Sequence, residues 1–293
     1  MKRLLRWTAG VAALLIAGFW LVTWPASPVP LDPAAGNRDL ANGEQIFHAG
    51  GCASCHGEDL GGGLELPTDF GTFRAPNISS DPVQGIGGWS EEAFVHAMRS
   101  GVSPGGRHYY PAFPYTAYAR ARIPDLLDLK AFIDSLPPVE RANDEHELPF
   151  PWNLRRGIGL WKRLYLDPRP VLTDGVGDPR LLRGRYLVEA LGHCGECHTP
   201  RDRLGGLDLG RWLAGGPAPE GEGRVPNITP HEDGIRDWSE KDIAYYLESG
   251  FTPDFDTVGG SMVDVQENLA KLGDEDRAAI AAYLKAVPAL PKR

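Results

Sequence analysis

The sequence predicts a mostly α-helical protein in which an apolar N-terminal helix precedes two similar domains. Two observations predict the paired domains: a Cys-x-x-Cys-His motif occurs twice, and the segments that flank it recur in the same order. A third observation predicts the helix, because three cations precede a long uncharged stretch. We divide the chain into a membrane anchor or signal segment at 1–30, domain 1 at 38–140, a linker at 141–181 and domain 2 at 182–290.

The N-terminal segment has the pattern of a membrane-spanning helix. Three cations in the first six residues precede Trp7 to Trp24, an 18-residue stretch without charge. As a helix this stretch is about 27 Å long, close to the hydrocarbon thickness of about 30 Å. The basic flank predicts a cytoplasmic N-terminus, and the tryptophans Trp7, Trp20 and Trp24 resemble interfacial anchors. A cleaved secretory signal is the alternative, but no clear A-x-A cleavage site follows, so we expect an uncleaved anchor.

The four cysteines of the chain all lie in the two Cys-x-x-Cys-His motifs. The motifs are Cys52-Ala53-Ser54-Cys55-His56 and Cys194-Gly195-Glu196-Cys197-His198. This pattern is the attachment signature of haem c, in which both thiols add to porphyrin vinyl groups and the histidine binds the iron. We therefore predict two covalently attached haem c groups. The expected attachment residues are Cys52, Cys55, Cys194 and Cys197, and the expected proximal iron ligands are His56 and His198.

Two other functions of paired cysteines fit this chain less well. Zinc ribbons bring their Cys-x-x-Cys pairs closer together than the 138 residues that lie between Cys55 and Cys194. A thioredoxin-like pair belongs at the start of a helix in a βαβ unit, and the sequence shows no such context. Haem attachment remains the prediction.

The segments around the motifs repeat as well. Gly43–Phe47 leads into the first motif as Gly184–Val188 leads into the second, and each pattern predicts a helix that ends at the cysteines. Downstream, a Pro-Asn-Ile-Ser/Thr segment and a Trp-Ser-Glu segment recur, and each serine is a good helix N-cap. Each repeat closes with a helix that prolines terminate, at Leu136-Pro137-Pro138 and at Val287-Pro288.

Both repeats resemble class I cytochrome c domains, which are mostly α-helical and hold the haem in a crevice. Residues from about 40 to 290 are more closely similar to the multihaem cytochrome subunits of periplasmic alcohol, gluconate and aldehyde dehydrogenases. Those subunits usually carry three haem domains, whereas this chain has two motifs. The stretches that carry the resemblance are Arg107–Tyr115, Gly192-His193-Cys194, Cys197–Arg201 and Gly259-Gly260-Ser261-Met262.

A methionine thioether is the sixth ligand that favours ferrous iron and raises the reduction potential. The chain has three methionines, and Met262 follows Gly259-Gly260-Ser261 in what we expect to be a flexible loop. We predict Met262 as the sixth ligand of the second haem. Met98 lies on an amphipathic helix pattern and is expected to be a core residue.

The first haem lacks an equivalent ligand. Shifting the second repeat by 149 residues aligns Trp238 with Trp89 and Met262 with Phe113, which cannot coordinate iron. In the resembling family this position normally holds the methionine. His108 is a weak alternative ligand. The first haem is then five-coordinate or has another ligand, and its potential is expected to be the lower of the two.

Other residues have secondary expected roles. The resemblance implies that Asn77 and Asn227 contact haem propionates, although turn and core packing explain them equally well. The linker is expected to pack as a helix across both domains, with contact to a membrane or partner as the alternative. The formal charge is −9, or −12 without the three N-terminal cations, which argues against nucleic-acid binding.

These features predict a membrane-anchored dihaem c-type cytochrome of a bacterial inner membrane, with its haem domains in the periplasm. It would transfer electrons between a dehydrogenase or quinol-linked donor and an oxidase or soluble cytochrome, which requires no catalytic acid or base. The alternative is a peroxidase-like dihaem enzyme, or a sensor, that uses an open first haem. In the enzyme, His108 or Glu91 would serve as the distal acid or base.

Overall fold

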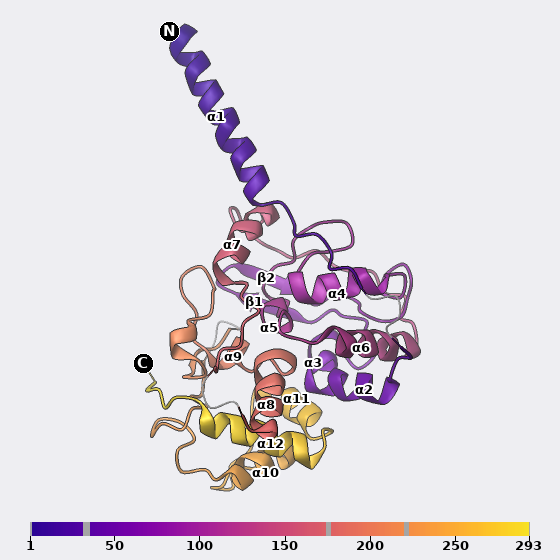
Figure 1. Ribbon diagram of the computed structural model, residues 1–293, viewed down its shortest axis with the longest axis vertical. Helices are drawn as coiled ribbons and strands as arrows, with labels where there is room; N and C mark the ends of the chain where they lie inside the picture. The colour runs from indigo at the N-terminus through magenta and orange to yellow at the C-terminus, as the bar shows by residue number, and fades with distance from the viewer. Residues whose placement is uncertain (1, 32–35, 174–176, 220–222, 293) are drawn as a thin grey trace.

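The computed structural model describes residues 2–31, 36–173, 177–219 and 223–292, and it is mostly α-helical (Figure 1). Helix α1 (Lys2–Val22) projects away from the rest of the chain, and all of its residues are exposed. Among the described residues it is the one helix that is long and apolar enough to cross a membrane. The predicted apolar N-terminal helix is therefore present.

Domain 1 packs its first and last helices against each other. The serine at its predicted N-cap position, Ser90, accepts a hydrogen bond from Ala93 N at 3.2 Å, and the last helix ends just before Leu136-Pro137 as predicted. The small hairpin was not predicted. The elements are α2 (Leu40–Ala49), α3 (Cys52–His56), β1 (Glu65–Thr68), β2 (Gly71–Arg74), α4 (Glu91–Ser100), α5 (Tyr115–Tyr118) and α6 (Ile123–Ser135).

Domain 2 repeats this order of helices. Ser239 caps its helix in a full capping box with Asp242, and the C-terminal helix ends just before Val287-Pro288. The elements are α8 (Pro179–Tyr186), η2 (Leu187–Leu191), α9 (Gly195–His198), η3 (Leu209–Arg211), β3 (Gly216–Pro217), β4 (Arg224–Val225), α10 (Glu240–Ser249), α11 (Met262–Leu269) and α12 (Asp274–Ala286).

Two glycines mark equivalent helix crossings in the repeats. A Cβ on Gly43 of α2 would lie 2.2 Å from Asp128 O of α6, and a Cβ on Gly184 of α8 would lie 2.0 Å from Ala279 O of α12. Only glycine permits this close approach of two backbones. Gly43 and Gly184 therefore occupy equivalent positions in the two domains and serve as a reference for comparing them.

Measured from these glycines, domain 2 has one extra residue before its first motif cysteine, Cys194. The helix accommodates this extra residue in the π-turn η2, in which Gly192 N donates to Leu187 O at 2.7 Å. An i→i−5 hydrogen bond accommodates one residue more than the α-helical pattern, and such turns are frequent at functional sites. The two motif-bearing segments thus reach their cysteines by different local geometry.

The linker contains η1 (Arg155–Gly157) and α7 (Ile158–Tyr165), and α7 contacts both domains. Lys162 Nζ donates to Ser100 O at 2.7 Å in domain 1, while Trp161 Nε1 donates to Leu204 O at 2.8 Å in domain 2. Buried apolar side chains from both domains also form one continuous core cluster. The interpretation of the linker as a helix packed across both domains agrees with these contacts.

Candidate haem-attachment sites

The two motif histidines have the same orientation. His56 donates its Nδ1–H to Pro76 O at 2.7 Å, and His198 donates its Nδ1–H to Pro226 O at 2.9 Å. With the proton on Nδ1, the lone pair of each ring lies on Nε2. A second hydrogen bond that fixes the tautomer and ring orientation is the usual support of a metal-binding histidine.

The proline carbonyls are themselves held in place. A Cβ on Gly62 would lie 2.5 Å from Pro76 C, and one on Gly215 would lie 2.7 Å from Pro226 C; both glycines have positive φ, +74° and +72°. The backbone after each histidine therefore lies directly against the proline that accepts from it. Leu60 and Leu213, two residues before these glycines, also both have positive φ near 60°, so the turn that ends at Gly62 and at Gly215 is the same in both domains.

Asn77 and Asn227 follow these prolines and are buried. Asn77 Nδ2 donates to Val139 O at 2.7 Å, and Asn227 Nδ2 donates to Leu290 O at 2.7 Å. Each Oδ1 accepts from the backbone N–H two residues ahead, at 2.9 and 2.8 Å. Both side chains thus tie the proline segment to the C-terminal end of their domain. The expected contact with a haem propionate stays a prediction.

The donor atoms suit a c-type haem. Burial lowers the pKa values of His56 and His198, although hydrogen bonding to the proline carbonyls opposes the shift, so both imidazoles are in the neutral form that binds iron. Cys52 and Cys194 are half-buried, whereas Cys55 and Cys197 are exposed. The residues needed for two thioether bonds and one axial ligand therefore lie together in α3 and in α9 with its N-cap Cys194.

The segments that precede the two motifs meet at the contact between the domains. His193, next to Cys194, donates from Nε2 to Gly50 O at 3.2 Å, two residues before Cys52. The His193 ring also makes an edge contact with Tyr118, with centroids 5.6 Å apart. The residues that precede one motif therefore contact the residues that precede the other.

A second contact involves the first motif itself. Asn268 of α11 donates from Nδ2 to Ser54 Oγ at 3.1 Å, and Ser54 lies between the two cysteines of the motif. Asn268 Oδ1 accepts from His48 Nδ1 at 3.3 Å. Because α11 begins at Met262, one short helix joins the expected distal side of the second site to the attachment helix of the first.

Comparison with known proteins agrees with this geometry. The cytochrome c family model matches residues 40–137 and 182–288, one match to each repeat. The chain belongs to the cytochrome c family. It is 55% identical to a diheme cytochrome c-type protein of Cereibacter sphaeroides, over 97% of this cytochrome and 98% of the relative.

Further relatives are longer than this cytochrome. The fructose dehydrogenase cytochrome subunit of Gluconobacter japonicus is 36% identical over 96% of the chain and 59% of the relative. The gluconate 2-dehydrogenase cytochrome c subunit of Pantoea cypripedii is 36% identical over 88% of the chain and 62% of the relative. The chain thus spans about three-fifths of these subunits, and the recognition of a cytochrome c that resembles dehydrogenase subunits is confirmed.

The loop that precedes the expected sixth ligand contains the same backbone bridge in both halves of the cytochrome. An antiparallel bridge and the hydrogen bond after it recur at an offset of 149 residues, which is the offset that aligns Met262 with Phe113. Met262 is half-buried and is the first residue of α11, so it lies at a helix start rather than in the flexible loop that we expected. Phe113 packs edge-on against Tyr109 at 5.6 Å. The ligand role of Met262 stays a prediction.

His108, the weak alternative ligand of the first haem, has protein partners at both ring nitrogens. It is 4% exposed, its Nε2 donates to Thr23 O at 2.9 Å, and its Nδ1 lies 3.2 Å from Lys162 Nζ. Burial lowers the pKa of His108 and brings that of Lys162 to about 7. This geometry gives no support to His108 as a ligand, and it assigns the side chain to the contact between α1, α7 and domain 1.

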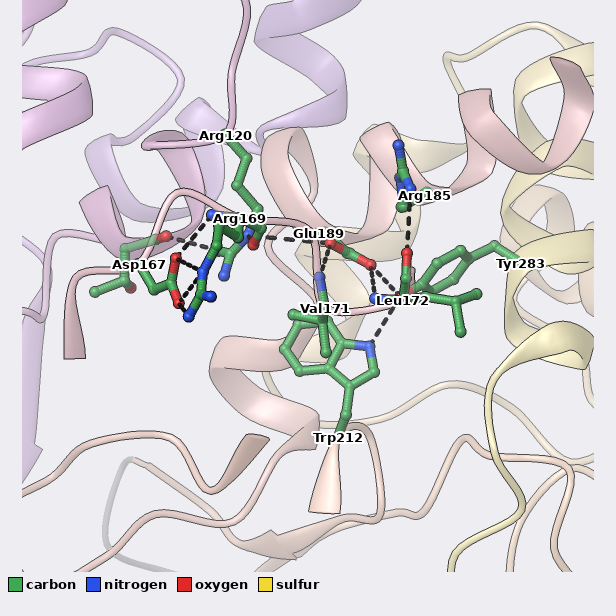
Figure 2. Close-up of polar contacts among 10 residues, drawn as sticks. Arg120, Asp167, Arg169, Val171, Leu172, Arg185, Glu189, Trp212 and Tyr283 are labelled. Carbon is green, nitrogen blue, oxygen red and sulfur yellow. Dashed lines mark hydrogen bonds and ion pairs between the residues drawn. The ribbon is translucent and has the colours of Figure 1, made fainter. Parts of the chain in front are cut away.

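A buried carboxylate that we did not predict lies in the π-turn before the second motif (Figure 2). Glu189 is 2% exposed and accepts from Val171 N at 2.7 Å, Leu172 N at 2.9 Å and Tyr283 OH at 2.6 Å. Arg120 of domain 1 lies 4.0 Å away. Glu189 thus joins the end of the linker to domain 2, at a point next to Arg120 of domain 1. The sequence signal was a lone acid within Leu187-Val188-Glu189-Ala190-Leu191.

Proposed function

We propose that this chain is a membrane-anchored dihaem c-type cytochrome that transfers electrons between a dehydrogenase or quinol-linked donor and an oxidase or soluble cytochrome. The contact between the two motif segments, through His193 and Gly50 and through Asn268 and Ser54, is the observation that carries this proposal. Two groups attached at these segments would be close enough for electrons to pass within the chain. The names of the relatives, cytochrome subunits of dehydrogenases, support a dehydrogenase as the donor.

The roles of the residues follow from their contacts. Each bound haem c supplies a one-electron iron couple. Cys52, Cys55, Cys194 and Cys197 would hold the porphyrins covalently, and His56 and His198 would bind iron through Nε2. Pro76 and Pro226 orient these imidazoles, and Glu189 and Asn268 fix the relative position of the domains. Met262 would supply a thioether ligand to the second iron, while Phe113 supplies none to the first site.

Several contacts favour an uncleaved anchor over a removed signal segment. Thr23, directly after α1, is fully buried, and its carbonyl accepts from His108. Arg156 donates to Thr23 Oγ1 and to Trp20 O, both at 2.8 Å, and Arg163 donates to Val22 O at 2.7 Å. The bonds to Trp20 O and Val22 O satisfy C-terminal carbonyls of α1 with arginine side chains of the linker. Removal of residues 1–30 would take these partners from Arg156, Arg163 and His108 Nε2.

Stopped-flow spectroscopy of the full chain in lipid nanodiscs tests the carrier function. The reduced protein is mixed with an oxidised soluble c-type cytochrome. Two double variants, Cys194→Ser/Cys197→Ser and Cys52→Ser/Cys55→Ser, each lacking the attachment cysteines of one haem, are measured in the same way. We expect two electrons per chain to leave the parent and one to leave each variant. Failure of the parent to pass electrons, or retention of both haems in a variant, would contradict the proposal.

The absence of a thioether at Phe113 favours one alternative, an open first haem that reacts with small ligands. A peroxidase-like enzyme also needs a distal acid or base. His108 has the partners described above, and Glu91 binds Arg38 with two hydrogen bonds of 2.8 Å. Mixing the reduced protein with hydrogen peroxide distinguishes the two functions: slow re-oxidation supports the carrier, whereas rapid catalytic turnover supports the enzyme.

We propose the bacterial inner membrane as the location, with the N-terminus in the cytoplasm and both haem domains in the periplasm. An alkaline phosphatase domain fused to the C-terminus is expected to be active, because this reporter folds in the periplasm. The intact mass of the purified protein is expected to include residues 1–30. A mass that lacks them would show that the segment is a signal peptide.

A further inference from the structure

The segment that contacts the end of α1 exposes apolar side chains and carries a positive charge. Phe150 is 76% exposed, Leu154 58%, Leu160 42% and Leu164 68%. Residues 150–165 contain four cations and no acidic residue, although the chain as a whole has a charge of −9. An apolar surface with basic neighbours is the composition of a segment that lies in a membrane interface.

Helical geometry places the two α7 leucines beside the α1 contact. Arg163 donates to Val22 O, and a Cβ on Gly159 would lie 2.8 Å from Thr23 Cα, so these residues mark the side of α7 that faces the end of α1. At about 100° per residue, Leu160 and Leu164 lie on the adjoining side of the helix, next to Arg163. Lys162 and Trp161 lie on the opposite side and bind the two domains.

The end of α1 gives the level of this surface relative to a bilayer. Arg156 lies over the rings of Trp20 and Trp24, 4.4 and 5.4 Å from their centroids. Tryptophan is enriched where a membrane-spanning helix leaves the hydrocarbon region. Figure 1 shows α7 directly below this end of α1, with domain 2 farther away. The apolar side of α7 is therefore continuous with the point at which α1 leaves the membrane.

We propose that α7 and the segment before it form a second membrane contact, which rests on the outer leaflet of the bilayer that α1 spans. Leu160 and Leu164 enter the boundary between headgroups and acyl chains, and Arg156 and Arg163 lie at the level of the phosphates, which suits an anionic phospholipid. This inference rests on the retained anchor of the proposed function. It orients the protein with domain 1 at the membrane and domain 2 toward the aqueous phase.

Site-directed spin labelling of the full chain in nanodiscs of phosphatidylglycerol and phosphatidylethanolamine tests the contact. A nitroxide is attached to Leu160→Cys or Leu164→Cys, with Ala13→Cys in α1 as the lipid reference and Phe255→Cys, a position 89% exposed in domain 2, as the aqueous reference. The native cysteines do not react if they carry haem. Collision with oxygen and with a water-soluble nickel chelate is measured for each label.

We expect the labels at 160 and 164 to collide with oxygen severalfold more, relative to the nickel chelate, than the label at 255. An aqueous result at both positions, with Ala13→Cys in lipid, would overturn the contact and leave the anchor intact. Protection from both reagents would show that protein, such as a second copy of the chain, covers α7. That result would also overturn the membrane contact. Loss of the Ala13 label together with the N-terminus would instead contradict the retained anchor. Labelling of the unsubstituted chain would contradict haem attachment at the four cysteines.

Discussion

Replacing Glu189 by glutamine tests whether this buried carboxylate holds the linker and the two domains in register. Glu189 Oε2 accepts from Val171 N, and Oε1 accepts from Leu172 N and Tyr283 OH. In glutamine one oxygen becomes an NH2 group, which must face a backbone N–H that it cannot satisfy. One hydrogen bond to a charged acceptor is lost, about 1.5–3 kcal/mol, and a buried donor is left unpaired. We expect a destabilisation of about 3 kcal/mol.

Urea unfolding of the haem-loaded chain in detergent, followed by circular dichroism, measures this change as a shift in the midpoint. Glu240→Gln is the matched control, because Glu240 and Arg180 form an ion pair of 2.7 Å in which both side chains are over 40% exposed. Such pairs contribute less than about 1 kcal/mol. A midpoint for Glu189→Gln that equals that of the control would refute the role that we assign to Glu189.

Three other changes have defined expected outcomes. Met262→Ala should remove the far-red sulfur-to-iron absorption band and lower one reduction potential. The control Met98→Leu, in the core, should leave the spectra of both haems unchanged. An unaltered spectrum for Met262→Ala would contradict the assignment of Met262 as a ligand. Gly184→Ala should destabilise by about 1–3 kcal/mol, because its Cβ meets Ala279 O at 2.0 Å, and Gly157→Ala, with open space, should be neutral. Burial and the charges of Lys162 and Arg156 lower the pKa of His108, so the unfolded state binds the proton more tightly and stability falls below about pH 6.5. His108→Gln can keep both hydrogen bonds and should reduce the dependence of unfolding free energy on pH by up to about 1.4 kcal/mol per pH unit. An unchanged dependence would contradict the role of His108 in this loss of stability.

The sequence predicted those parts of the fold that depend on local chemistry. The serine caps at Ser90 and Ser239 form as expected because a hydroxyl satisfies orphan N–H groups of the same segment. The 149-residue offset also holds, because the loop bridges that follow α4 and α10 recur in both halves.

What the sequence left undetermined depends on long-range contacts. Nothing local shows that His108 binds Thr23 and Lys162, which are separated from it by 85 and 54 residues. The sequence aligned Gly43 with Gly184, but only the structure shows that the extra residue before Cys194 forms a π-turn. Glu189 was not predicted, because only the fold brings Val171 and Tyr283 to it. Contacts between distant segments were therefore the part that pattern analysis could not supply.

A redox titration of the full chain, followed by absorption and EPR spectroscopy with carbon monoxide added after reduction, tests the central claim most directly. Two one-electron haem couples per chain are predicted, of which the lower belongs to the first haem and only that haem binds carbon monoxide rapidly. Two equivalent low-spin haems that resist carbon monoxide would contradict the inequivalence derived from Phe113 and Met262. A single haem, or none, would contradict the dihaem cytochrome itself.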